Sequence, residues 1–138
     1  MSRKTVLVVD DQEVVRRLLS ALLRTIPADI VTATSGRDAC DILQDRTRNL
    51  DLAIVDLILP HGSGWEVVDA IRANPQRAAM PIVVLTGASI SKEERARLSS
   101  KVSAVVPKAQ FDTEAVKQTV MDLLRIHSAT PVDSEDEQ

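Results

Sequence analysis

Two kinds of hydrophobic pattern alternate along the chain. Several short apolar runs, rich in valine and isoleucine, are typical of strands buried on both faces, and one stretch alternates as a more exposed strand would. These patterns predict five strands, at residues 5–9, 29–34, 50–55, 81–86 and 104–107. Between them, apolar residues recur at intervals of three and four, which predicts helices. We expect these helices at residues 14–23, 36–44 and 65–73, from 91 onward, and from 112 or 113 onward.

The alternation of strands and helices decides the fold class. Strands that each lead into a helix specify an α/β fold with a parallel sheet, and the right-handed crossover rule places helices on both faces. The fourth helix opens with a capping box at Ser91 but has few apolar residues, and Ser35 begins a similar signal for the second. The final stretch, SATPVDSEDEQ, is acidic and has no period. We therefore expect one domain over 1–127 and a disordered tail over 128–138.

Composition narrows the class of protein. The chain has 138 residues, 44% hydrophobic and 27% charged, which is the balance of an ordinary globular domain. A net charge of −3 argues against a basic nucleic-acid-binding surface, and one tryptophan with one phenylalanine predicts an aliphatic core. No apolar stretch approaches the roughly 18 residues of a membrane span, and no signal peptide precedes Thr5. The single Cys40 cannot form an internal disulfide, which is compatible with a reducing compartment. Together with the lack of a long apolar stretch, this leads us to expect a cytoplasmic protein without membrane insertion.

Polar side chains suited to phosphoryl or metal chemistry follow four of the predicted strands. They are Asp10 and Asp11, Asp56, Thr86 and Lys108. Functional groups of parallel sheets collect at the carboxyl ends of strands, and with a flavodoxin-like order 2-1-3-4-5 these ends would be neighbours. Three ionised carboxylates need a compensating cation, and hard oxygen ligands suit Mg²⁺. An oxygen of Asp56 would remain as a nucleophile toward phosphorus, with Lys108 as a counter-charge and Thr86 as a hydrogen-bond donor.

Each of these residues also has a purely structural interpretation. Asp10 and Asp11 could cap the first helix, and Asp56 could begin the turn that continues into PHGSG. Thr86 and Lys108 could be ordinary residues at strand ends. All of them occur at the ends of strands that would be neighbours in the sheet, and this favours a phosphoacceptor site with Asp56 at its centre.

Over about residues 3–127 the chain resembles the receiver domain of two-component response regulators, of the chemotaxis-regulator kind. The resemblance is carried by VLVVDD with Asp10 and Asp11, AIVDLILP with Asp56 and Pro60, Gly64, VVLTG with Thr86, and Lys108. Gly87 is a small residue at a position where the family favours one, so that a phosphodonor can approach. The resemblance implies a bacterial-type signalling protein of the (βα)5 doubly wound fold. Such a protein catalyses its own phosphotransfer and dephosphorylation but has no separate substrate, so it is not an enzyme in the usual sense.

The resemblance also implies roles for individual residues. The Mg²⁺ ligands would be Asp11, Asp56 and the backbone carbonyl of Ile58, with Asp10 assisting through water. Asp56 would accept a phosphoryl group from a sensor histidine kinase or a phosphotransfer protein. Thr86 would then turn toward the phosphate and Lys108 would bridge to it. These changes would switch the surface of the fourth helix, fifth strand and fifth helix for a downstream protein partner.

The chain departs from the family pattern near this site. Ala109 follows Lys108 where the family has a proline with a cis bond; a non-proline cis bond costs about 3 kcal/mol, which favours a trans bond and a reshaped loop. Val105 stands where the family has a switch aromatic, so the usual threonine–aromatic coupling is absent. Ile58 and Ala88 are apolar where the family often has polar groups that help water attack. We therefore expect slow self-dephosphorylation.

Other classes of protein predict other residues. A phosphorylation-independent pseudo-receiver, a pure interaction module, would lack the acidic pair, Asp56 or Lys108. A phosphatase with an aspartate nucleophile and Mg²⁺ would carry Asp-x-Asp after the first strand, and a flavodoxin would need a Ser/Thr/Gly-rich loop in place of DDQEVV. We therefore expect a single-domain response regulator, with the interaction module or the N-terminal receiver of a longer regulator as alternatives.

Overall fold

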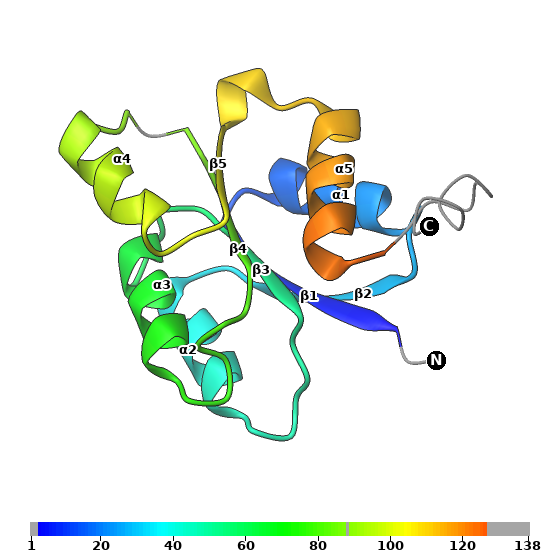
Figure 1. Cartoon of the computed structure of the whole chain (residues 1–138), viewed down its shortest axis with the longest axis horizontal. Coiled ribbons are helices and arrows are strands. Elements are labelled where there is room, and N and C mark those ends of the chain that lie inside the picture. Colours follow the sequence, from blue (N-terminus) through cyan, green and yellow to red (C-terminus); the bar gives the residue numbers. More distant parts are fainter. Residues whose placement is uncertain (1–2, 88, 127–138) are drawn as a thin grey trace, which may run out of the picture.

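The computed structural model describes residues 3–87 and 89–126, and its elements follow the predicted order (Figure 1). The strands are β1 (Lys4–Val9), β2 (Ala28–Ala33), β3 (Leu52–Val55), β4 (Ile82–Thr86) and β5 (Ala104–Pro107). The helices are α1 (Glu13–Leu23), α2 (Gly36–Gln44), α3 (Gly64–Ala73), α4 (Lys92–Ser99) and α5 (Thr113–Leu124). A 3₁₀ helix that the sequence did not predict, η1 (Lys108–Gln110), lies between β5 and α5.

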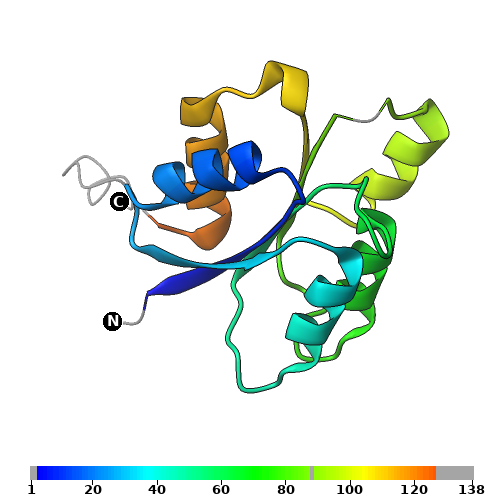
Figure 2. The ribbon, with the colours of Figure 1, turned by 180° about the vertical axis from the view of Figure 1, so that it is seen from behind.

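All the strands are parallel, and their order in the sheet is β2-β1-β3-β4-β5. The flavodoxin-like doubly wound fold is therefore confirmed. Helices α1 and α5 cover one face of the sheet, and α2, α3 and α4 cover the other (Figures 1 and 2). This order places the carboxyl end of β1 beside that of β3, with the ends of β4 and β5 following along the same edge.

The core is aliphatic and lies in two layers, one on each side of the sheet. Because successive strand residues point to opposite faces, Val6 and Val8 of β1 pack under α1 and α5, while Leu7 and Val9 pack under α2 and α3. Burial on both faces explains why the central strands read as continuous apolar runs rather than as alternating ones.

Serine side chains begin three of the helices. Ser35 and Ser63 accept hydrogen bonds from the third backbone N–H of α2 and α3. Ser91 and Glu94 form the reciprocal capping box predicted for α4, with hydrogen bonds of 3.1 and 3.0 Å. Leu98 is the only buried residue of α4, which agrees with the weak apolar pattern of that helix.

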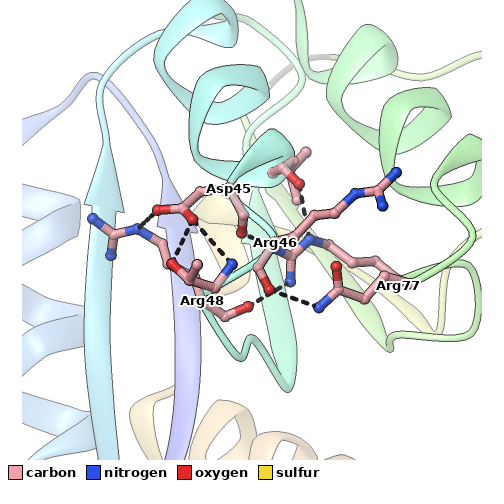
Figure 3. Close-up of polar contacts among 7 residues, drawn as sticks. Asp45, Arg46, Arg48 and Arg77 are labelled. Atoms are coloured by element: carbon pink, nitrogen blue, oxygen red, sulfur yellow. Dashed lines mark hydrogen bonds and ion pairs between the residues drawn. The ribbon is translucent and has the colours of Figure 1, made fainter.

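A buried arginine ties two loops together at the amino-terminal edge of the sheet (Figure 3). The Arg77 side chain is 3% exposed, and its guanidinium donates to the backbone carbonyls of Leu43, Asp45 and Arg48 at 3.1, 2.8 and 3.2 Å. Asn74 donates to the same carbonyl of Leu43 at 3.1 Å. We call these contacts the Arg77 clamp. They supply donors to the carbonyls of Leu43 and Asp45 at the end of α2, and to that of Arg48 in the loop that follows.

The division into domain 1–127 and tail 128–138 stays a prediction, because the proposed tail lies outside the described residues. Among the helices of the described residues, none combines the length and the apolar character needed to cross a bilayer.

Candidate functional site

Two buried carboxylates stand side by side at the carboxyl edge of the sheet. Asp10 follows β1 and is 2% exposed; Asp56 follows β3 and is 4% exposed. The backbone N–H of Asp56 donates to the Val9 carbonyl at 2.9 Å, and that of Asp10 donates to the Ala33 carbonyl at 3.1 Å. These hydrogen bonds continue the pattern of the sheet by one residue beyond each strand. The apolar strands therefore hold both side chains where the sheet ends.

Lys108 pairs with both of these carboxylates. It begins η1 directly after β5, and its Nζ lies 3.0 Å from Asp10 Oδ2 and 2.9 Å from Asp56 Oδ2. The same ammonium donates a hydrogen bond to the side-chain oxygen of Gln12. Charges that are taken out of water need partners of opposite sign, and Lys108 provides the partner for two aspartates at once.

The surroundings of Asp10 and Lys108 shift the pKa of each of these two side chains. Burial raises the pKa of the Asp10 carboxyl, and the hydrogen bond from the Gln12 N–H with the nearby Lys108 charge opposes this only in part. Burial disfavours the charge on Lys108, but its hydrogen bonds to Asp56 and Asp10 outweigh that effect and raise the pKa of the ammonium. Lys108 therefore stays a cation throughout the neutral range.

A third carboxylate completes an acidic cluster. Asp11 is exposed beside the buried pair, and one oxygen from each of Asp10, Asp11 and Asp56 lies within 4.8 Å of the others. When all three are ionised and Lys108 is charged, the cluster carries −3 + 1 = −2. The ligand atoms are hard oxygens, and Asp11 and Asp56 line a cleft of about 550 Å³ together with Ile58 and Gly87. This donor set and its charge fit a divalent cation such as Mg²⁺.

The loop between β3 and α3 packs tightly against the phosphoacceptor candidate. The Ile58 N–H donates to Asp56 Oδ1 at 3.2 Å, while the Ile58 side chain is 65% exposed at the cleft. A Cβ at Gly64 would lie 2.0 Å from the Asp56 carbonyl oxygen and 2.6 Å from Leu57 Cα. Only glycine allows α3 to start this close to the end of β3, which gives a physical reason for Gly64 in the motif.

The remaining predicted positions lie around the same edge. Thr86 ends β4 and is 2% exposed, and Gly87 lines the cleft, where an added Cβ would meet only the Lys108 side chain at 3.9 Å. Ala88 lies outside the described residues. Val105 is half-buried, pairs with Val84 of β4 and packs on the α2–α4 side of the core.

The structure decides the geometry of the loop after β5. No peptide bond in the described part of the chain is cis, so the Lys108–Ala109 bond is trans. The reshaped segment is η1, and Lys108 reaches both aspartates from its first residue. The replacement of proline by Ala109 thus leaves the lysine in contact with the acidic pair.

Sequence reasoning missed two residues at the site. The Gln12 N–H donates to Asp10 Oδ1 at 2.9 Å, and Arg16 donates to the Asp10 backbone carbonyl at 2.9 Å. The first contact could have been found, because aspartate often accepts a hydrogen bond from the backbone two residues on. No sequence pattern indicates the second, because Arg16 lies among other charged residues of α1.

Comparisons with known proteins agree with this geometry. The family model of the response regulator receiver domain matches residues 6–121. TcrX, a probable transcriptional regulatory protein of Mycobacterium tuberculosis, is 33% identical over 130 residues, which cover 94% of this chain and 53% of TcrX. Protein PilG of Pseudomonas aeruginosa is 27% identical over 132 residues, which cover 94% of this chain and 92% of PilG.

A solved structure shows the same fold. The signal receiver domain of a LuxO repressor protein from Vibrio parahaemolyticus superposes with a TM-score of 0.79 at 27% identity, covering 89% of this chain and 91% of that domain. The chain spans about half the length of TcrX and smaller fractions of several other curated relatives. With a family model that matches most of its length, the chain belongs to the response regulator receiver domains.

Proposed function

We propose that this chain is a phosphorylation-dependent receiver and that Asp56 is its phosphoacceptor. The observation that carries the proposal is the position of the Asp56 carboxylate. It is buried at the base of a cleft, beside two other carboxylates, and held 2.9 Å from the Lys108 ammonium. A side chain that only capped a turn would need neither the lysine nor the acidic neighbours.

The phosphodonor would be the phosphohistidine of a sensor histidine kinase or of a phosphotransfer protein, as for receiver domains in general. A carboxylate oxygen of Asp56 attacks phosphorus, a new P–O bond forms, and the P–N bond to the histidine breaks. The imidazole leaves with the electron pair of that bond and takes up a proton. The product is an acyl phosphate on Asp56.

Several residues around Asp56 would assist the phosphoryl transfer in different ways. The Ile58 N–H holds Asp56 Oδ1, which fixes the orientation of the carboxylate before the donor arrives. Lys108 neutralises part of the charge that the phosphoryl group brings, and Thr86 supplies a hydroxyl from the end of β4. Gly87 leaves the approach to the cleft open. Asp10, Asp11 and Asp56, with the backbone carbonyl of Ile58, would hold Mg²⁺, which when bound screens the phosphoryl oxygens from the carboxylates.

The test is to incubate the protein with Mg²⁺ and acetyl phosphate and to measure its intact mass. We expect one added phosphoryl group, which is lost in Asp56→Asn and when a chelator is present. Folded Lys108→Met should accept the group more slowly, because one counter-charge is removed. A folded wild-type protein that takes no phosphoryl group would contradict the proposal and favour a phosphorylation-independent interaction module.

A further inference from the structure

Helix α4 buries little apolar surface against the rest of the molecule. Leu98 is its only buried residue, and most of the other residues in Lys92–Ser99 are exposed. One buried side chain gives a helix little apolar area to fix its orientation. Other contacts must therefore decide where α4 lies.

Three contacts join α4 and the turn after it to one face of α3, which lies on the same side of the sheet (Figure 1). Arg97 Cζ lies 4.8 Å from the centre of the Trp65 ring. Lys101 Nζ lies 2.8 Å from Asp69 Oδ1, and the Lys101 carbonyl accepts a hydrogen bond from Arg72 Nε at 2.8 Å. We call these contacts the α3–α4 bridge.

The spacing of the bridge residues explains how they meet. Trp65, Asp69 and Arg72 are four and three residues apart, so they share one face of α3. Arg97 and Lys101 are also four residues apart, near the end of α4 and in the turn that follows. Arg72 additionally donates to the carbonyls of Ala78 and Met80 at 3.0 and 2.7 Å, just before β4.

The other end of α3 is tied to the phosphoacceptor. A Cβ at Gly64 would lie 2.0 Å from the Asp56 carbonyl oxygen, and the Gly64 N–H donates to the Leu57 carbonyl at 3.0 Å. Trp65 is the next residue. A shift of the backbone at Asp56 must therefore move the start of α3 and with it one side of the bridge.

The bridge contacts are of a kind that can form and break without unfolding the protein. The side chains of Lys101 and Asp69 are 38% and 61% exposed, and Arg97 is exposed as well. Partly solvated ion pairs and cation–π contacts are individually weak. A helix held by such contacts can take a second position at small cost, which a coupling element requires.

We infer that the α3–α4 bridge couples the Asp56 site to the position of α4. The inference rests on the proposed function, because the signal is the phosphoryl group on Asp56, which adds about −1.5 to −2 of charge. The added group displaces the backbone after β3, α3 carries the displacement to Trp65 and Asp69, and α4 follows through Arg97 and Lys101. By linkage, the contacts that hold α4 also bias the site.

The test uses the whole chain, labelled with ¹⁵N, with Mg²⁺ present throughout and with spectra taken before and after acetyl phosphate is added. Intact mass measures the phosphoryl group, and ¹H–¹⁵N spectra follow the amides of 56–64 and of α4. In the wild type both sets should shift on phosphorylation. The double variant Arg97→Met/Lys101→Met removes two of the three bridge contacts and leaves the hydrogen bond to the Lys101 carbonyl, so it should keep the shifts at 56–64 and reduce those of α4.

The matched control is Arg95→Met, which removes an exposed arginine of α4 outside the bridge and should leave the α4 shifts as in the wild type. Arg97→Lys keeps a cation over Trp65 and should retain part of them. Two results would overturn the inference while leaving the proposed function intact. One is a phosphorylated double variant whose α4 shifts equal those of the wild type, and the other is a phosphorylated wild type whose α4 amides do not shift. If the mass shows no phosphoryl group on the folded wild type, the proposed function fails and the inference fails with it.

Discussion

The substitution Arg77→Met is expected to lower the free energy of unfolding by about 3 kcal/mol. It removes three hydrogen bonds to the carbonyls of Leu43, Asp45 and Arg48, while the methionine keeps most of the buried apolar volume (Figure 3). Bonds from charged donors contribute about 1.5 kcal/mol or more, but two of these carbonyls keep a second donor, so we use about 1 kcal/mol for each. Those second donors are Asn74 and the Arg48 N–H.

The assay is equilibrium unfolding in urea, followed by the fluorescence of Trp65 and by far-ultraviolet circular dichroism. Arg46→Met is the matched control, because Arg46 is an exposed arginine of the same loop and its guanidinium makes no ion pair within the described part of the chain. We expect it to change stability by less than about 0.5 kcal/mol.

The slope of free energy against urea should stay unchanged in both variants if only native-state contacts are lost. Equal stability of Arg77→Met and wild type, or an equal loss in both variants, would refute the reasoning about the clamp. Folded Arg77→Met should still accept the phosphoryl group, since the clamp lies at the opposite edge of the sheet from Asp56.

Three further predictions concern single positions. Gly64→Ala should lower the free energy of unfolding by more than about 2 kcal/mol in urea and reduce the phosphorylation yield, because its Cβ cannot fit beside the Asp56 carbonyl. Burial, with the charges of Glu66 and Asp41, raises the pKa of the Cys40 thiol, so at pH 8 it should react more slowly with a disulfide reagent in the folded protein than in urea. The phosphoryl group should last longer than seconds after the donor is removed, and Ile58→Asn should shorten that lifetime in a time course of intact mass.

Each of these predictions has an outcome that contradicts it. Gly87→Ala is the control for the stability effect of Gly64→Ala, because its Cβ would have space; equal losses of stability in the two variants would remove the argument from close approach. Identical thiol rates in the folded and unfolded protein would mean that Cys40 is not shielded. If the lifetime of the phosphoryl group is unchanged in Ile58→Asn, the apolar side chain at the cleft is not the cause of slow dephosphorylation.

The edge of the sheet that carries the site could be predicted because strand ends are visible in the sequence. Asp10, Asp56, Thr86 and Lys108 each follow an apolar run directly, and a parallel sheet brings such ends to one edge. The limits of the strands were harder to predict from the sequence: β3 starts at Leu52 rather than at residue 50. Asp51 instead bonds to Thr5 through its carboxylate and its backbone N–H, both at 2.8 Å.

The Arg77 clamp and the α3–α4 bridge could not be predicted for a different reason. Arg72, Arg77 and Arg97 look in the sequence like solvated surface charges, and no period marks them. Their partners are backbone carbonyls and an aromatic ring that are about 30 residues away in the chain. Such contacts follow from the relative placement of whole helices, which local patterns do not contain.

The two edges of the sheet have opposite effects on the stability of the fold. At the carboxyl edge, two buried aspartates share one lysine, and a third carboxylate beside them adds charge that only a further cation can balance. Repulsion within a site of this kind lowers the stability of the fold, because buried like charges repel. At the amino edge, Arg77 binds three carbonyls and adds no unpaired carboxylate to the interior. Stability is therefore supplied at the edge away from the acidic cluster, and the site that we propose accepts a phosphoryl group can keep its repelling carboxylates.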